Sequence, residues 1–400
     1  MGLNRFVKSV GMRAVKAVKQ NYAPSEEVLE LLEDFRLMVN DCVRIGLKEN
    51  VSSLKSLSLK AYHQLSVYDV PSYYKLCAIS KATGILKNYG KSARKNPKTK
   101  PPYARKLMLT TCYGFKIEAG VLMIPLGERR YVEIPLNSHT KGILSNPSYT
   151  ARSVTLTART VAIAFSKETA EIEPTGLIGI DRNLDNVTLA DTDGKTIRYD
   201  ISKATEIKAK CRETKIRFKR NDARVRRILF QKYGEIERNK VHWILHNVSS
   251  SIVRQAKEGG LAIAMEKLTG MRKLYQRGNG QGANYRARLN SWSYHELQRQ
   301  IEYKAKWEGI KVIYVPANHT SSLCSICGSK ITECAERRGW CSQCRTLMDR
   351  DVNAARNILA KAGLRFGLWG EACEAMVEGL SQEVILKVDA SQSSHHPTET

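Results

Sequence analysis

Cys324-Ser-Ile-Cys327 and Cys341-Ser-Gln-Cys344 are two matched cysteine pairs, and Asp349-Arg-Asp351-Val-Asn-Ala-Ala-Arg-Asn-Ile358 follows them almost at once. Each Cys-x-x-Cys holds two thiolates on one turn, so two such turns supply the four soft ligands of tetrahedral zinc. A redox Cys-x-x-Cys is the alternative, but a redox motif would not come as a matched pair. The stretch therefore predicts a structural zinc site beside a helix that begins with a carboxylate.

The other thiols do not suggest a disulfide framework. Cys334 falls between the two pairs and is expected to be a spare thiol, while His319 is a weaker candidate for a zinc ligand. The remaining cysteines are scattered: Cys42, Cys77, Cys112, Cys211 and Cys373. This usage fits a reducing cytosolic compartment in which thiolates bind metal.

Three carboxylates are candidates for a second metal site. Asp181 and Glu266 each end an apolar strand, and Asp351 stands at the start of a helix. Carboxylates that converge at strand ends repel one another unless cations lie between them, and hard oxygen ligands suit Mg²⁺ or Mn²⁺. Taken singly, each could be a turn residue, a surface charge or a helix cap. Asp349 is the rival for the third position, and we expect it to cap the helix or form the turn.

The charge of the chain favours a polyanionic partner. Its 400 residues carry a formal charge of +26 with a pI near 9.7, which points to nucleic acid. An acidic membrane surface is the competing partner, but no apolar run is long enough to span a bilayer. The first twenty residues are basic and lack acids, as in a transit peptide, but their alternation favours a first strand.

Two basic segments are expected to contact phosphate rather than to be merely solvated. Residues 87–106 form an acid-free loop or linker, and residues 201–257 form a long basic helical region, expected to be a hairpin bent near Gly234. The residues we assign to nucleic-acid binding are Lys95, Lys98, Lys100, Lys219, Arg220, Arg224 and Arg227.

Periodicity predicts two kinds of region along the chain. Helical spacing marks residues 25–46, capped by Ser25, and residues 54–86, whereas 107–165 alternates in short segments typical of a small β-barrel or sandwich. A three-stranded meander is expected over 177–200, with later strands at 260–266 and 311–315 and an amphipathic helix near 293–306. The helical block would then be inserted after the first strand of the β-region.

Four strings together resemble the TnpB (OrfB-type) family of insertion-sequence proteins, which is similar to the compact type V CRISPR effectors. They are Gly179-Ile-Asp181-Arg-Asn183, Met265-Glu266-Lys-Leu, Thr320-Ser-Ser-Leu-Cys324-Ser-Ile-Cys327-Gly328 and Asp349-Arg-Asp351-Val-Asn-Ala-Ala-Arg-Asn-Ile358. The matches cover about residues 177–360. Two departures are Arg182-Asn183, where a hydrophobic residue and glycine are commoner, and Arg345, where glycine is common.

The resemblance implies a fold of the α/β and α+β multidomain class. A RuvC-like, RNase H-type nuclease domain (173–318 and 347–363) would carry a zinc-ribbon insertion (319–346). A wedge-like β-barrel (1–22 and 104–172) would be interrupted by a helical recognition lobe with the basic linker (23–103). Residues 364–400 lose any pattern and are expected to form a disordered tail.

The resemblance also implies an RNA-guided, transposon-encoded DNA endonuclease. Its catalytic residues and Mg²⁺ (or Mn²⁺) ligands would be Asp181, Glu266 and Asp351, and its Zn²⁺ ligands Cys324, Cys327, Cys341 and Cys344. The partners would be a guide RNA from the transposon end and double-stranded DNA beside a short adjacent motif, in a prokaryotic cytoplasm at the nucleoid. The alternative is a guided DNA-binding repressor, or an accessory transposition protein, that does not cleave.

Overall fold

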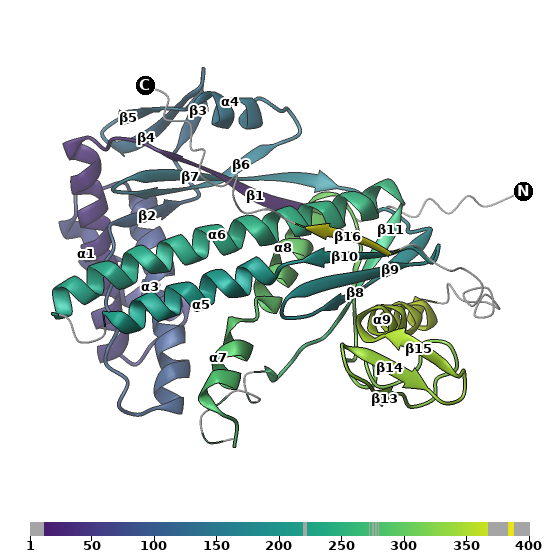
Figure 1. Ribbon diagram of the computed structural model, residues 1–400. Coiled ribbons are helices and arrows are strands. Elements are labelled where there is room, and N and C mark those ends of the chain that lie inside the picture. Colours follow the sequence, from purple (N-terminus) through teal and green to yellow (C-terminus); the bar gives the residue numbers. More distant parts are fainter. Residues whose placement is uncertain are drawn as a thin grey trace, which may run out of the picture. The chain divides into compact units, whose positions relative to one another are not determined.

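The computed structural model describes residues 12–218, 222–366 except 272, 274, 275, 277 and 279, and 383–387. The chain divides into two compact units, one covering Arg13–Glu168 and the other covering the described residues from Thr169 onward. Figure 1 shows the elements of both. Among the described helices, none combines the length and the apolar character that a membrane span requires.

The unit Arg13–Glu168 contains two antiparallel sheets. One has the order β1-β7-β6-β2 and the other the order β3-β4-β5. The alternation predicted over 107–165 thus corresponds to real strands, and they lie in two separate sheets. The strands are β1 (Met12–Asn21), β2 (Met108–Thr111), β3 (Lys116–Glu118), β4 (Val121–Gly127), β5 (Arg130–Pro135), β6 (Thr150–Thr157) and β7 (Thr160–Thr169).

Helices follow the first strand of this unit, as the periodicity predicts. Ser25 caps α1 by accepting a hydrogen bond from the Val28 amide at 3.4 Å. Lys87–Lys95, expected to be loop or linker, is instead the end of α3, because lysine and arginine are good helix formers whatever their charge. The helices are α1 (Glu26–Lys48), α2 (Leu54–Ala61), the 3₁₀ turn η1 (His63–Val67), α3 (Ser72–Lys95) and α4 (Ser138–Leu144).

The second unit is built on a six-stranded sheet of order β12-β11-β8-β9-β10-β16. The predicted meander forms its centre, since β8 (Gly176–Arg182), β9 (Asn186–Asp191) and β10 (Thr196–Asp200) pair antiparallel. On the other side of β8, β11 (Leu261–Glu266) and β12 (Val312–Val315) add in parallel. The carboxyl ends of β8 and β11 therefore meet at one edge of the sheet.

Both faces of this sheet are buried, each beneath helices. Ile178 and Ile180 pack with residues of α6 (Ala223–Glu258) and α8 (Tyr294–Trp307). Leu177 lies on the opposite face and packs with Ile358 and Leu359 of α9 (Arg350–Phe366). Because side chains alternate along a strand, Asp181 shares the α9 face with Leu177.

The basic helical region is a hairpin, but its bend is not at Gly234. Helix α5 (Ser202–Arg217) ends before Asp222 caps α6, and Gly234 lies inside α6. A single glycine costs a long helix only about 1 kcal/mol, so it does not mark the turn. A further helix, α7 (Ala283–Ser291), precedes α8.

The segment between β12 and α9 forms a small three-stranded sheet of order β13-β14-β15. Its strands are β13 (Thr332–Glu333), β14 (Arg338–Cys341) and β15 (Thr346–Asp349). The expectation of a disordered tail from residue 364 is wrong in two places, because α9 continues to Phe366 and β16 (Glu383–Lys387) pairs in parallel with β10. The other tail residues lie outside the described residues.

Candidate metal centres

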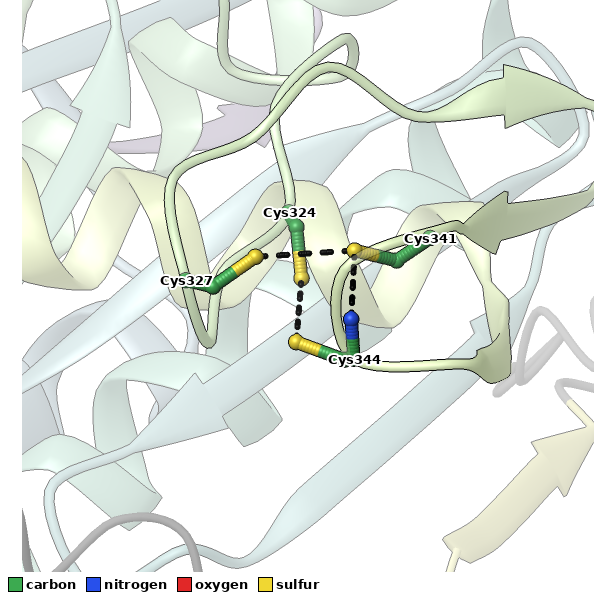
Figure 2. Close-up of side chains that lie close together, drawn as sticks. All are labelled: Cys324, Cys327, Cys341 and Cys344. Carbon is green, nitrogen blue, oxygen red and sulfur yellow. Dashed lines mark hydrogen bonds between the residues drawn. The ribbon is translucent and has the colours of Figure 1, made fainter.

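The four cysteines of the two pairs converge on one point. Their sulfur atoms all lie within 4.8 Å of one another, with 3.9 Å between Cys324 and Cys344 and 3.5 Å between Cys327 and Cys341. Figure 2 shows the four side chains pointing inward from two facing turns. A tetrahedron with Zn–S bonds of about 2.3 Å has edges of about 3.8 Å, which is close to these two spacings, so the four thiols suit tetrahedral zinc.

The two turns reach this geometry through left-handed backbone. Gly328, after the first pair, has φ +74°, and Arg345, after the second, has φ +53°. Glycine adopts this region freely, whereas a side chain costs about 1–2 kcal/mol. The departure from glycine at Arg345 therefore leaves the turn and its ligands in place but under strain. His319 and Cys334 do not belong to the cluster.

Helix α9 is tied to the first cysteine turn by two asparagines. Asn353, which is buried, accepts from the Ser325 amide and donates to the Leu323 carbonyl, each at 2.7 Å. Asn357 donates to the carbonyls of Thr320 and Leu323 at 2.8 and 2.7 Å. The first cysteine turn and the start of α9 are thus joined by hydrogen bonds close to Asp351.

Asp181 is buried at the end of β8. Asn183 donates a hydrogen bond of 2.7 Å to its carboxylate. Burial, and then the nearby carboxylates of Glu266 and Asp351, raise the pKa of Asp181 to about 7. Desolvation and like charges both disfavour the ionised form, and a bound cation would oppose both effects.

Asp351 is also buried, on the first turn of α9, where polar groups from two other segments contact it. Asn186 donates to Oδ2 at 3.1 Å, and the Arg337 guanidinium, from the turn between β13 and β14, reaches Oδ1 at 2.5 Å. Asp349 caps the helix, which is the alternative role expected for it. Its carboxylate accepts from the amides of Asp351 and Val352 at 2.8 and 3.0 Å, which caps the helix.

Glu266 ends β11 and is contacted by the hydroxyl of the buried Thr320. Glu266 and Asp351 both lie close enough to Asp181 to raise its pKa. Within the described residues, however, only the cysteines have ligand atoms all within 4.8 Å. The carboxylates form a looser set of hard oxygen donors, whose chemistry fits Mg²⁺ or Mn²⁺.

Sequence reasoning missed the polar residues around the carboxylates. Asn183 lies in the turn after β8 and Asn186 begins β9, so their nearness to Asp181 in the sequence is an available signal. Arg337 had none. It also donates to Asn183 at 3.0 Å, across 154 positions of sequence, and only the fold brings the two together.

The residues assigned to nucleic-acid binding are exposed wherever the structure describes them. Lys95 ends α3, and Lys98 and Lys100 follow it. Arg224 and Arg227 lie on the first turns of α6. Lys219 and Arg220 fall outside the described residues.

Comparison with known proteins identifies the family to which the chain belongs. Residues 294–358, which contain α8, β12, the ribbon and the start of α9, match the family model described as Cas12f1-like, TNB domain. The chain is 33% identical over 262 residues to the TnpB-like protein MJ0751 of Methanocaldococcus jannaschii, covering 62% of this chain and 93% of that protein. The chain belongs to the TnpB family.

This TnpB-family chain is also related to compact type V effectors. It is 39% identical over 118 residues to the CRISPR-associated endodeoxyribonuclease Cas12f1 of Sulfoacidibacillus thermotolerans, a match that covers 28% of this chain and 25% of that protein. It resembles the solved structure of a Cas12f1-sgRNA-target DNA complex with a TM-score of 0.59 and 15% identity, covering 84% and 83% of the two chains. At that identity the likeness shows a shared fold.

Proposed function

We propose that this TnpB-family protein is an RNA-guided DNA endonuclease that hydrolyses phosphodiester bonds at Asp181, Glu266 and Asp351. The observation that carries the proposal is the meeting of these carboxylates. Two end neighbouring parallel strands, the third begins the helix packed on the same sheet, and burial raises the pKa of Asp181 to about 7. A carboxylate with a strongly raised pKa beside other carboxylates is typical of an active site.

The central strand order β10-β9-β8-β11-β12 supports a RuvC-like, RNase H-type domain, which we assign to residues 173–318 and 347–363. We further assign 319–346 to the zinc ribbon, 1–22 with 104–172 to a wedge-like β-barrel, and 23–103 to a recognition lobe. The protein would act in a prokaryotic cytoplasm, at the nucleoid, as the product of a transposon.

In this proposal the protein's own side chains orient the metal ligands. Asn183 holds Asp181, Thr320 contacts Glu266, and Asn186 with Arg337 holds Asp351. Divalent cations bound by the three carboxylates would stabilise the attacking and leaving oxygens of the phosphodiester. Cys324, Cys327, Cys341 and Cys344 would hold a structural Zn²⁺, which keeps the ribbon folded and Asp351 in place.

Recognition would be divided between RNA and protein. A guide RNA from the transposon end would pair with the target strand, while the protein reads duplex shape and a short adjacent motif. The basic residues at and just after the end of α3, together with Lys219, Arg220, Arg224 and Arg227, would hold the phosphate backbone, as the charge of +26 suggests. Names given to related proteins, such as endodeoxyribonuclease, support the same activity.

The test is cleavage of a plasmid library by the protein purified with its co-expressed RNA, in the presence of Mg²⁺. We expect cuts in guide-matched targets, and a loss of at least about a thousand-fold in rate for Asp181→Ala, because the site would lose a ligand. Guide-directed binding without cleavage would instead support the repressor alternative. Undiminished cleavage by Asp181→Ala would contradict the proposal that these three carboxylates form the active site.

A further inference from the structure

The residue after Asp181 is a buried arginine. Arg182 ends β8 and is 2% exposed, at a position where the resembled family commonly has a hydrophobic residue. A guanidinium buried without partners would cost several kcal/mol, so its hydrogen bonds determine what it does there. Alternation along β8 directs it to the face opposite Asp181, toward α8.

Arg182 connects three elements of the fold. Its Nη2 donates to the backbone carbonyl of Glu266 at 2.5 Å, and its Nη1 donates to Oε1 of Gln298 on α8 at 2.9 Å. The network continues from Gln298 to Glu302 at 3.1 Å, and the Tyr314 hydroxyl donates to the same Glu302. Among the described residues, Arg182 Nε has no hydrogen-bond partner, so the two Nη contacts hold the group.

These contacts lie where the backbone ladder stops. The pairing of β8 with β11 ends at Ile180 and Met265, one residue before Asp181 and Glu266. Beyond that point, Asp181 pairs with β9 and Glu266 with β12. The bond from Arg182 to the Glu266 carbonyl therefore continues the connection between the two strands past their last paired residues.

We propose that Arg182 is a positioning residue: by bridging the Glu266 carbonyl and Gln298, it sets the separation of the Asp181 and Glu266 carboxylates that bind the divalent cation. This inference rests on the proposed function for the identity of the site. A planar guanidinium presents two Nη atoms in a fixed fork to acceptors on different elements, whereas the lysine ammonium is a single point donor that cannot occupy both Nη positions. Lysine would thus keep the charge but not the geometry of the bridge.

The experiment measures Mn²⁺ binding to the full chain with its RNA by calorimetry, alongside the Mg²⁺ concentration for half-maximal cleavage. We expect Arg182→Met and Arg182→Lys to weaken Mn²⁺ binding about ten-fold or more, as outer-shell changes do. Gln298→Leu, which removes one acceptor, should have a smaller effect. Arg299→Met is the matched control, because Arg299 lies on the same helix but pairs with Glu296, and it should bind Mn²⁺ like wild type.

Wild-type Mn²⁺ affinity in Arg182→Met would overturn the inference, and so would full rescue by lysine, which would leave charge as the cause. If Arg182→Met does not fold, Gln298→Leu decides, and unchanged binding there counts against the bridge. A wild-type protein that binds Mn²⁺ through Asp181 but cuts no DNA removes the proposed function and leaves the positioning role. A wild-type protein that binds no Mn²⁺ through Asp181 removes both.

Discussion

At the scale of single residues, the candidate site depends on close backbone approach as well as on charge. Gly179 precedes Asp181 by two positions on the same face of β8, and α9 lies directly against it. A Cβ at this position would fall 2.3 Å from the Ala355 carbonyl oxygen and 2.7 Å from the Leu359 amide nitrogen. Glycine thus lets the helix that carries Asp351 approach the strand that carries Asp181.

We predict that Gly179→Ala lowers the free energy of unfolding by about 1–3 kcal/mol, because the helix backbone must move away from the strand. Denaturant unfolding of the purified chain measures this. Gly234→Ala is the control, since nothing lies within 4 Å of a Cβ there and α6 should gain up to about 1 kcal/mol. Equal stability in the two variants would show that α9 does not pack as closely as described.

At the scale of elements, the ribbon is small and depends on its thiols. We predict that strong chelation, or Cys324→Ser, lowers the melting temperature and displaces zinc, because metal binding contributes directly to the folding of such modules. Metal analysis and thermal unfolding measure the effect. Cys334→Ser is the control within the same ribbon, because its exposed sulfur lies outside the cluster. Unchanged stability after complete metal removal would contradict the zinc assignment.

The packing of α6 against α8 predicts a pH dependence. Burial, and then Lys304 and His242, lower the pKa of His246 from 6.5 to about 4, against the opposing charge of Glu296. Arg299 also disfavours its protonation, and the Tyr303 hydroxyl lies 3.3 Å from Nδ1. Between about pH 6.5 and pH 4 the unfolded chain therefore binds a proton that the folded protein does not. Stability should fall as the pH falls through this range.

We expect His246→Gln to reduce the loss of unfolding free energy at acid pH by on the order of 1–3 kcal/mol, because glutamine does not titrate. Melting curves at pH 7 and pH 4.5 compare the variant with wild type. The exposed His139→Gln should keep the wild-type dependence. If the two variants respond alike, His246 is not the group responsible.

At the scale of the whole molecule, the excess of 65 basic over 39 acidic residues predicts salt-sensitive binding of nucleic acid. We predict that Arg224→Gln with Arg227→Gln weakens binding of unrelated duplexes uniformly and lowers the salt slope by about 1–2. Anisotropy titrations at several KCl concentrations measure it. Arg13→Gln with Arg44→Gln carries the same charge change at arginines that pair more closely with acids than Arg224 does with Asp222 at 3.8 Å, and should leave the slope higher. Equal salt slopes in the two double variants would show that the loss of net charge alone explains the weaker binding.

Local patterns predicted many of the helices and strands, and they nominated the seven proposed ligands. Period-two alternation placed Asp181 and Glu266 at strand ends, and Cys-x-x-Cys spacing brought thiols into pairs within single turns. Predictions from composition were less accurate, because charge and single glycines do not control helix length. Lys87–Lys95 is helical and α6 passes through Gly234 unbroken.

Short-range sequence patterns were enough to propose the metal ligands, since ligand type and close spacing are properties of neighbouring residues. What surrounds these residues depends on the tertiary fold. Arg337 reaches Asp351 and Asn183, and Arg182 bridges β8, β11 and α8, because packing brings together residues that are far apart in the chain. The ribbon that carries the four cysteines thereby also contributes, through Arg337, a positively charged side chain beside Asp351.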